Sequence, residues 1–484
     1  MTVAGTHDVV VVGSGAGGGV VAGELAQRGR DVVLLETGPH LTAADFTRWE
    51  AKANHDMWWP LRLVPLPSGE MFAFLAGRCV GGTTTINTKV ALRAHERDVA
   101  KWHGLTGLTN DRGEPFDVSD LAPFYDRVEQ VLGVRERHDW CKSVRTVEPG
   151  FRAMGVELEP VHSYTDVNCM RCGSCLQGCP TNAGKSTQNT YIHEAWARGL
   201  LDLRANATVE RVLVEDAGDG PEATGVEYTD AAGERQTVRA RSVVVAAGTL
   251  NSPQLLVKSG LRGPWIGRNL GLHPVRLVYG LFDEPQDTHM VYPISAHCMD
   301  FQHDEDGGFA IEATTIQDPI SFATTLTDEH GPLWGDRLVE ALRGFRHWVG
   351  VLAMVNDENN AVVAVDENGA ERFDIEFQPV ELERIERAFD FSRQVLLAAG
   401  ARQIAWSGLA STHVQGTCRM GDDPEHSVVD RDCESHEVKR LYVGDGSVVP
   451  RTLSVNPSLT IMALATRLAE HLDADPKGYL VRAT

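Results

Sequence analysis

The chain has 484 residues, of which 42% are hydrophobic and 23% charged, so it is long enough for two domains with ordinary buried cores. Its formal net charge of −22 argues against binding to nucleic acid and to anionic membrane surfaces. No run approaches 18 uncharged apolar residues and the start lacks a signal-peptide pattern. We therefore expect no integral membrane segment and a cytoplasmic protein, exported only as the passenger of a partner that carries a signal.

Residues 1–38 predict a strand, a glycine turn, a helix and a second strand. The strands are the apolar runs Val9–Val12 and Val32–Leu35, and the helix is Val20–Gln27. Between the first strand and the helix stands Gly-Ser-Gly-Ala-Gly-Gly, which matches G-x-G-x-x-G. A turn in this position is typical of dinucleotide binding.

Each residue of this turn has a physical role in binding a pyrophosphate. Gly13 permits the tight turn, Gly15 beside Ser14 lets backbone amides approach the phosphates, and Gly18 lets the helix pack on the strand. Glu36, at the end of the second strand, is placed to accept hydrogen bonds from an adenosine ribose. An ordinary βαβ turn with a surface glutamate is the alternative, and the motif does not separate FAD from NAD.

Further along, residues 40–75 are rich in Trp and Pro and are expected to be irregular. A tight glycine–threonine segment follows at residues 77–87. Strand-like runs at Val209–Val214 and Val243–Ala246 have the same pattern as the strands predicted in the first 38 residues.

Residues 280–405 have a different pattern. They contain an alternating aromatic segment, Arg372–Gln378, and an amphipathic helix from about Glu381 to Ala399. A final helix is expected from about Ser458 to Leu472. The chain therefore leaves the nucleotide-binding domain and comes back to it.

Three parts of the chain resemble the signatures of the glucose-methanol-choline (GMC) oxidoreductases, which are flavoenzymes. They are Gly77–Asn87 (GRCVGGTTTIN), Gly248–Leu256 (GTLNSPQLL), and the C-terminal block His413–Thr417 (HVQGT), Asp445–Ser447 (DGS) and Asn456-Pro457. The resemblance implies FAD as the cofactor. Residues 280–405 match nothing specific, and in this family that region shapes the substrate pocket.

By this resemblance, further residues would contact the flavin, the ribitol or the phosphates. The glycine–threonine segment and the Asp-Gly pair each have a plainer interpretation as turns. The residues expected at the cofactor are Gly13, Ser14, Gly15, Gly18, Glu36, Gly81, Gly82, Thr83, Asn87, Val209, Gly248, Asp445, Gly446 and Pro457.

The predicted fold is α/β, or α+β overall. It comprises a Rossmann-like FAD-binding domain and a second, substrate domain built on an antiparallel sheet with helices. The predicted boundaries are 1–95, 195–280 and 406–484 for the discontinuous FAD-binding domain, 96–194 for an insertion that holds a cap and a cysteine cluster, and 281–405 for the substrate domain.

Oxidation of an alcohol by hydride transfer requires a group that takes the hydroxyl proton, and histidine is suited to this near neutral pH. The family places this histidine in H-x-x-G-T, which is His413 here. The second catalytic position is Asn456, which can donate a hydrogen bond to the substrate oxygen but cannot titrate. Taken alone, a histidine is more often structural and Asn-Pro is a common turn pair.

Four of the nine cysteines lie within eleven residues, and an odd total argues against a disulfide framework. Cys169, Cys172, Cys175 and Cys179 have the C-x2-C-x2-C-x3-C-P spacing of bacterial ferredoxins. Without Cys172, the spacing resembles the three-iron site of FAD-dependent sugar dehydrogenases. We predict a 3Fe-4S or 4Fe-4S cluster, with a structural zinc site or no metal as alternatives.

The predicted function is an FAD-dependent dehydrogenase that oxidises a hydroxyl of a sugar, related polyol or other alcohol by hydride transfer to flavin N5. Electrons would leave through the cluster to an acceptor protein or to a quinone-like or dye-like acceptor. The alternatives are an O₂-dependent alcohol oxidase that makes peroxide and, from another class, an FAD-containing hydroxynitrile lyase.

Overall fold

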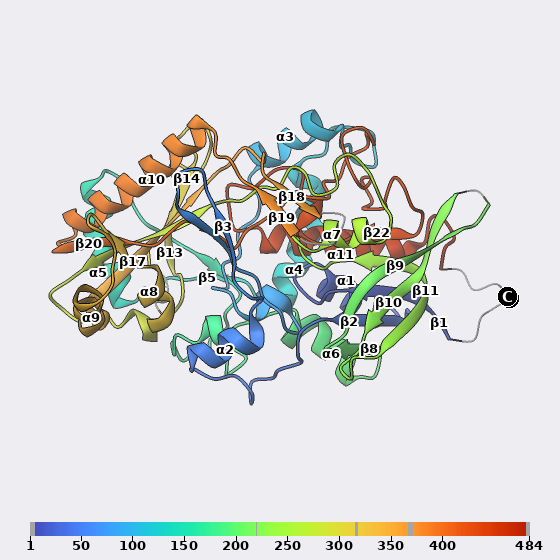
Figure 1. The fold of residues 1–484 in the computed structure, drawn as a ribbon, viewed down its shortest axis with the longest axis horizontal. Helices are drawn as coiled ribbons and strands as arrows, with labels where there is room; N and C mark the ends of the chain where they lie inside the picture. Colours follow the sequence, from blue (N-terminus) through green and yellow to red (C-terminus); the bar gives the residue numbers. More distant parts are fainter. Residues whose placement is uncertain (1–4, 219, 315–317, 366–370, 481–484) are drawn as a thin grey trace.

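The computed structural model describes residues 5–218, 220–314, 318–365 and 371–480. Two lobes lie side by side along the long axis of the molecule, and each is built on its own large sheet with helices packed against it (Figure 1). One sheet has a parallel centre and the other is almost wholly antiparallel. This arrangement confirms the predicted fold class of a Rossmann-like lobe beside a lobe built on an antiparallel sheet.

The first sheet has seven strands in the order β8-β2-β1-β11-β10-β9, with β22 paired to β11. Val9, Val10 and Val11 are fully buried, as expected for a central parallel strand with both faces covered. Helix α1 (Gly18–Gln27) packs against α11 (Ser458–Ala474). The strands are β1 (Thr6–Val12), β2 (Val32–Glu36), β8 (Leu201–Ala205), β9 (Thr208–Asp216), β10 (Pro221–Thr229), β11 (Arg235–Val245) and β22 (Leu441–Val443).

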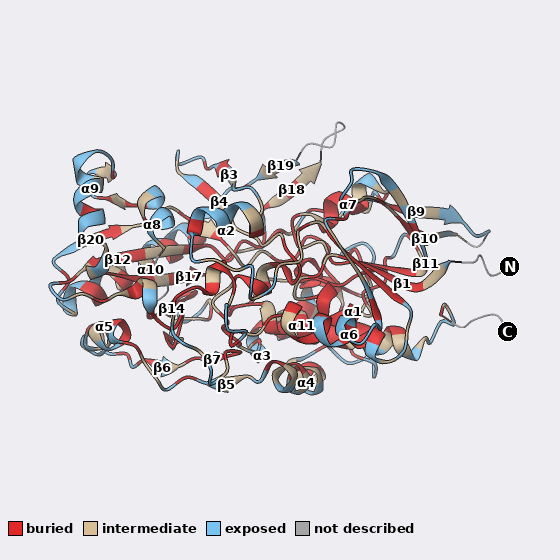
Figure 2. Ribbon diagram, turned by 90° about the horizontal axis from the view of Figure 1, so that it is seen from below, coloured by how far each residue is buried: buried red, intermediate tan, exposed pale blue. Residues whose placement is uncertain are grey.

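The second sheet has eleven strands, and its long pair β12–β17 is buried in the core (Figure 2). Helix α10 (Pro379–Ala398) packs on this sheet, and α5 (Lys142–Ala153) packs on α10. The strands are β3 (Arg62–Pro65), β4 (Met71–Phe74), β6 (Glu159–Pro160), β12 (Val275–Leu281), β13 (Ala296–Cys298), β14 (Phe309–Glu312), β15 (Thr327–Asp328), β16 (Gly331–Pro332), β17 (Trp348–Val355), β20 (Gln403–Trp406) and β21 (Ala410–Ser411).

The remaining elements connect the two lobes or cover their surfaces. None of the helices in the described ranges combines the length and apolar character that crossing a bilayer requires. These elements are α2 (Glu50–Met57), α3 (Glu96–Thr106), α4 (Ala122–Leu132), α6 (His193–Ala197), α7 (Ser252–Lys258), α8 (Pro319–Thr325) and α9 (Asp336–Arg343), with the small strand pairs β5 (Arg135–Glu136) with β7 (His162–Ser163) and β18 (Val362–Val365) with β19 (Glu371–Asp374).

Two local predictions were wrong. Residues 40–75 are not irregular, because they contain α2 and the β3–β4 hairpin, and β4 joins the second sheet by pairing with β21. The alternating segment Arg372–Gln378 does not keep one regular structure, because it is strand only as far as Asp374. Helix α10 begins directly afterwards, where Gln378 and Glu381 form a capping box around Pro379.

Candidate active site

A cavity of about 490 Å³ lies at the carboxyl ends of β1, β2 and β11, which is where open α/β sheets bind their ligands. Its wall combines the glycine turn of the first lobe with residues 411–414 and 456–458 of the C-terminal block. The volume is in the range of small-molecule sites. The cavity therefore brings the dinucleotide motif and the predicted catalytic pair to one place.

The glycine turn forms a cradle that side chains would obstruct. A Cβ at Gly13 (φ +93°) would lie 2.3 Å from the carbonyl oxygen of Ala246, and one at Gly18 would lie 2.0 Å from that of Gly13. A Cβ at Gly15 would meet nothing within 4 Å. Gly15 thus faces open space in the cavity, as close approach of a pyrophosphate requires.

The Glu36 carboxylate lies at the end of β2 and lines the same cavity. It accepts hydrogen bonds from the backbone N–H of Ser14 (3.0 Å), from the Ser14 hydroxyl (2.6 Å) and from the Gly38 N–H (2.9 Å). Burial raises the pKa of Glu36 and these hydrogen bonds oppose the rise. Glu36 therefore both fixes the glycine turn and stands where an adenosine ribose would bind.

Asp445 joins two signature segments that are distant in sequence. Its carboxylate accepts hydrogen bonds from the Gly248 N–H (2.8 Å), the Ser447 N–H (2.8 Å) and the Ser252 hydroxyl. These donors occupy both carboxylate oxygens, so Asp445 holds the backbone of Gly248 and Gly446 at the cavity wall.

Most residues expected at the cofactor line this cavity, although their roles remain predictions. Gly18 and Gly81 lie behind the wall: Gly18 packs α1 on the sheet, and the Gly81 N–H donates to the Ser14 hydroxyl (2.9 Å). The residues that line the cavity are Gly13, Ser14, Gly15, Glu36, Gly82, Thr83, Asn87, Val209, Gly248, Asp445, Gly446 and Pro457.

His413 and Asn456 meet at the cavity wall, and a third residue supports them. The Asn456 amide nitrogen is 3.4 Å from His413 Nε2 and donates to Glu312 Oε1 at 3.0 Å. Glu312 ends β14 and is 1% exposed. It is absent from the cavity lining, so Glu312 lies behind Asn456 and orients its amide group.

Three buried polar atoms of this group have no hydrogen-bond partner among the described residues: His413 Nδ1, Asn456 Oδ1 and Glu312 Oε2. Buried polar atoms are rarely unsatisfied, so such a cluster is typical of a site that binds a ligand or ordered water. Burial lowers the pKa of His413 to about 4 and raises the pKa of Glu312 to about 7. At neutral pH the His413 imidazole is therefore neutral and able to accept a proton.

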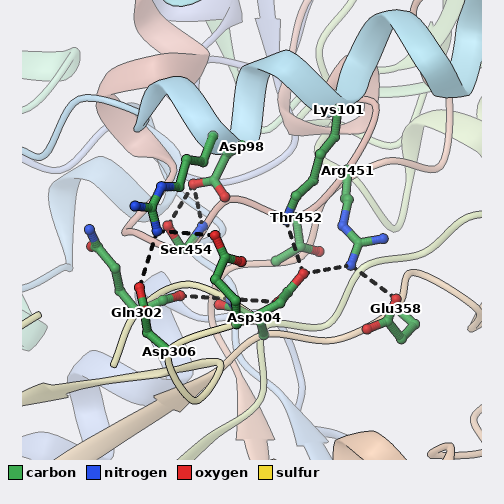
Figure 3. Close-up of polar contacts among 12 residues, drawn as sticks. Asp98, Lys101, Gln302, Asp304, Asp306, Glu358, Arg451, Thr452 and Ser454 are labelled. Atoms are coloured by element: carbon green, nitrogen blue, oxygen red, sulfur yellow. Dashed lines mark hydrogen bonds and ion pairs between the residues drawn. The ribbon is translucent and has the colours of Figure 1, made fainter. Parts of the chain in front are cut away.

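The segment that carries Asn456 is fixed by a network of charged and polar groups (Figure 3). Asp98 on α3 accepts hydrogen bonds from the Ser454 N–H (3.0 Å) and the Ser454 hydroxyl (2.6 Å). Arg451 pairs with Glu358 (3.0 Å) and Asp304 (3.4 Å). The backbone two to five residues before Asn456 is thus held from both sides, which sets where the amide can reach.

The four clustered cysteines surround a second, much smaller cavity of about 10 Å³. All four are free thiols, and Cys175 is buried while Cys169, Cys172 and Cys179 are partly exposed. Their loop also forms part of the first cavity, because Leu176 lines it and the Leu176 carbonyl accepts from the Trp58 indole N–H (3.2 Å). The cysteine loop and the cofactor cavity therefore share a wall.

Positive charges and backbone donors face these thiols. The buried Lys89 attracts Cys175 and Cys179 electrostatically, and Arg137 attracts Cys169. The Gly184 N–H donates to Cys179 Sγ at 3.2 Å. Burial alone would raise the pKa of Cys179, but the Gly184 and Thr181 hydrogen bonds and the Lys89 charge lower it overall. The surroundings therefore favour a thiolate at Cys179 alone, because burial raises the pKa of Cys169 and of Cys175.

In the parts of the chain that the structure describes, no three His, Cys, Asp or Glu side chains are arranged to hold one metal ion. A tetrahedral zinc site would need all its sulfurs at about 2.3 Å from a single centre. An iron–sulfur cluster places several iron and sulfide atoms between its thiolates, so it requires a wider set of ligands.

The sequence interpretation missed Glu312 and Lys89. Glu312 is the only charged residue of the strand Phe309–Glu312, and a carboxylate in such an apolar run is a signal for a buried, functional acid. Lys89 carries no comparable signal in one sequence, because its burial depends on residues far away in the chain.

Comparisons with known proteins give a consistent result. Residues 7–275 and 364–465 match the N-terminal and C-terminal family profiles described as GMC oxidoreductase. An uncharacterized GMC-type oxidoreductase of Mycobacterium tuberculosis is 30% identical over 97% of this chain and 76% of its own. A long-chain-alcohol oxidase of Arabidopsis thaliana is 28% identical over 95% of this chain, which spans only 66% of that relative. Paromamine 6'-oxidase of Streptomyces fradiae is 27% identical over 97% of this chain and 91% of its own.

Solved structures share the fold at low sequence identity. Pyridoxine 4-oxidase from Mesorbium loti superposes with a TM-score of 0.74 at 19% identity, covering 96% of this chain and 99% of its own. An FAD-dependent oxidoreductase from Chaetomium thermophilum gives a TM-score of 0.72 at 15% identity, covering 98% of this chain and 100% of its own.

Proposed function

Because this chain belongs to the GMC oxidoreductase family and is an FAD-dependent oxidoreductase, we propose that it is a dehydrogenase that oxidises a hydroxyl group of a sugar or related alcohol. The observation that carries the proposal is the His413–Asn456 pair at the wall of the cofactor cavity, with Glu312 behind it and an unsatisfied polar atom on each of the three residues. The cradle at Gly13, Gly15 and Gly82 fits the pyrophosphate of FAD.

Bound FAD supplies the acceptor for the hydride. The chain's own residues manage the proton and the oxygen. The neutral His413 imidazole takes the hydroxyl proton at Nε2, and the Asn456 amide donates a hydrogen bond to the same substrate oxygen. Glu312 keeps the amide in position by accepting its hydrogen bond.

The character of the cavity supports a polyhydroxylated substrate. Trp58 and Trp59 supply aromatic surface to the wall, where the Arg62 guanidinium lies 5.3 Å from the centroid of the Trp59 ring, and Arg62, Asn251 and Glu371 supply polar groups. The Arg62 guanidinium donates hydrogen bonds to the Asn251 and Glu371 side chains, each at 2.8 Å. Aromatic faces beside a few fixed polar groups suit a sugar ring, which has apolar C–H faces and polar edges.

We include the iron–sulfur cluster in this proposal, with Cys169, Cys172, Cys175 and Cys179 as its ligands and a role as one-electron acceptor. The C-x2-C-x2-C-x3-C-P spacing of these cysteines is the observation that supports this assignment. The enclosed space of about 10 Å³ holds little more than one water molecule, so the thiols as the structure places them leave no room for a cluster. The nine free cysteines suit the reducing cytoplasm, which is part of the proposal.

An O₂-dependent alcohol oxidase is the second candidate, and one observation favours it. The relatives and structural neighbours include several proteins named as oxidases, among them the long-chain-alcohol oxidase, paromamine 6'-oxidase and pyridoxine 4-oxidase. Such an enzyme would need no cluster, and its cysteines would only shape the loop.

Turnover with two acceptors separates the candidates. Anaerobically purified protein, analysed for iron and acid-labile sulfide, is supplied with a sugar or alcohol and either a dye acceptor or O₂. The dehydrogenase proposal expects cluster-level iron and faster turnover with the dye. Iron-free protein that turns over faster with O₂ and releases peroxide would establish the oxidase instead. An FAD-containing hydroxynitrile lyase would leave its flavin oxidised with every alcohol.

A further inference from the structure

His273 is a second buried histidine beside the proton acceptor His413. Its side chain is 0% exposed, and neither of its ring nitrogens has a hydrogen-bond partner among the described residues. Its ring centroid lies 5.1 Å from that of His413, and the two ring planes are tilted by 36°. Buried polar atoms are normally hydrogen-bonded, so two adjacent imidazoles with unpaired nitrogens point to a role for the pair.

Backbone pairing fixes the two histidines opposite each other. Gly271 and Gln415 exchange two hydrogen bonds, of 2.8 and 3.0 Å. On the other side of both histidines, β12 pairs with β21. Continuing the register of the Gly271–Gln415 pair places His273 across from His413, where side chains share a face and Cβ atoms lie about 4.5–5.5 Å apart. The contact between the two rings therefore follows from the backbone.

A buried carboxylate holds the His273 backbone in an uncommon conformation. Its φ of +44° lies in the left-handed region that residues other than glycine seldom occupy. Asp357 is 1% exposed and accepts hydrogen bonds from the N–H groups of Leu272 (2.7 Å) and His273 (3.0 Å). Conformations of this kind persist where the surroundings fix them, often at functional sites. The imidazole is thus kept beside His413 at a cost in backbone energy.

The contact between Asn456 and His413 indicates which ring nitrogen carries the proton. The Asn456 amide nitrogen, which donates to Glu312, also lies 3.4 Å from His413 Nε2 and has only N–H groups to offer. Nε2 is therefore the bare nitrogen, and the neutral ring carries its proton on Nδ1. His413 Nδ1 is buried without a partner among the described residues. Proton uptake at Nε2 thus requires an acceptor for the Nδ1–H group.

We propose that His273 is the positioning residue that accepts the Nδ1–H of His413, directly or through one water, and so keeps Nε2 free for the substrate proton. This inference rests on the proposed function, because it completes the proton acceptor of that reaction. Ring centroids roughly 5 Å apart suit an N–H···N hydrogen bond between two imidazoles. Burial and the neighbouring His413 hold the pKa of His273 well below its ordinary value, so its ring is neutral and offers one bare nitrogen. The partner of one ring nitrogen sets which tautomer a histidine adopts.

The first test reads the His413 tautomer of the FAD-loaded wild-type protein by nitrogen NMR with isotopically labelled histidine. The His413 ring signals are assigned by their absence from the spectrum of His413→Ala. We expect a protonated Nδ1 and a bare Nε2. A proton on Nε2 would overturn the proposal without the use of any His273 variant.

The second test compares variants at this position. His273→Leu removes the acceptor, whereas His273→Asn keeps one and tolerates the left-handed backbone. His303→Leu is the matched control, because His303 is also a buried imidazole beside another, that of His95, with centroids 4.3 Å apart. We expect His273→Leu to keep FAD, to populate the Nε2-protonated form of His413 and to slow anaerobic flavin reduction roughly tenfold or more. His273→Asn should recover most of the rate, and His303→Leu should leave the His413 tautomer unchanged.

If His273→Leu does not fold, His273→Gly takes its place, because glycine adopts the left-handed backbone without strain. An unchanged His413 tautomer in the variant without an acceptor, or a flavin reduction rate equal to that of His303→Leu, would overturn the positioning role and leave the proposed function standing. Wild-type flavin that no alcohol reduces would overturn the proposed function. The tautomer is read without substrate, so the two failures are distinguishable.

Discussion

At the scale of single residues, the proton acceptor His413 is separate from the acid Glu312, which orients the Asn456 amide. His413 touches the cavity and stays neutral because burial lowers its pKa to about 4. Glu312 has no access to the cavity, and burial raises its pKa to about 7. Among His413, Asn456 and Glu312, only Glu312 therefore titrates near neutral pH. Asn456 lies between Glu312 and the substrate.

The first prediction concerns the pH dependence of kcat/KM. As pH rises through about 7, Glu312 loses its proton, and its charged carboxylate then accepts the Asn456 hydrogen bond more strongly and holds the amide more firmly. The rate should therefore rise with pH to a plateau. Glu312→Gln should be roughly tenfold to a hundredfold slower at the plateau and lack the inflection near 7. An unchanged inflection in that variant would assign the titration to another group.

The second prediction concerns stability. The pKa of Glu312 is raised from 4.5 to about 7, so ionisation opposes folding increasingly from pH 4.5 upward and in full above pH 7, while below pH 4.5 the carboxyl is neutral in both folded and unfolded protein. Glu312→Gln should stabilise the FAD-loaded protein at pH 8 by on the order of 3 kcal/mol, because one pKa unit corresponds to about 1.4 kcal/mol. Urea unfolding at pH 8 and pH 4 measures this, and an equal effect at both would refute the burial argument.

At the scale of elements, helix α3 and the segment before Asn456 depend on each other. The buried Asp98 satisfies two donors of Ser454, so its removal leaves them unpaired inside the protein. Two lobes contribute to this junction, because Asp304 and Glu358 pair with Arg451 from the other side (Figure 3).

The third prediction is that Asp98→Ala lowers the free energy of unfolding by about 1–3 kcal/mol and slows flavin reduction, because the Asn456 backbone loses an anchor. The matched control is Asp126→Ala, which removes an ion pair between Arg93 and a side chain that is 70% exposed. Exposed pairs of this kind contribute about 0–1 kcal/mol. Equal losses of unfolding free energy and of flavin reduction rate in Asp98→Ala and Asp126→Ala would show that Asp98 has no special role in placing Asn456.

The elements also show what the sequence can specify. The strand–turn–helix start and α10 follow from local apolar periodicity, and both are present. The β3–β4 hairpin could not be found in this way, because its partner β21 lies more than 300 residues later and supplies the pairing. Glu36 and Asp445 line the cavity, and their role at the cofactor stays a prediction, while their bonds to Ser14 and Gly248 depend on tertiary contacts that the sequence does not show.

At the scale of the whole molecule, the chain builds one cavity from segments at its start, centre and end. Residues 13–17, 246–251 and 411–414 meet there, and the cysteine loop reaches the same wall through Leu176. The motifs identified these segments because close approach to a dinucleotide restricts their residues to glycine and small polar types. They could not reveal Glu312 or Lys89, whose importance arises only from what folding places beside them.

The most direct test of the central claim is anaerobic reduction of the flavin by alcohols. The wild-type protein is mixed with a panel of sugars, polyols and simple alcohols without O₂, and bleaching of the flavin absorbance is followed in time. The account predicts bleaching by at least one of them, and a rate lower by roughly 10²-fold or more in His413→Ala that still holds FAD, as expected for a lost general base. Equal rates in the two proteins, or FAD-loaded wild type that no alcohol bleaches, would contradict it.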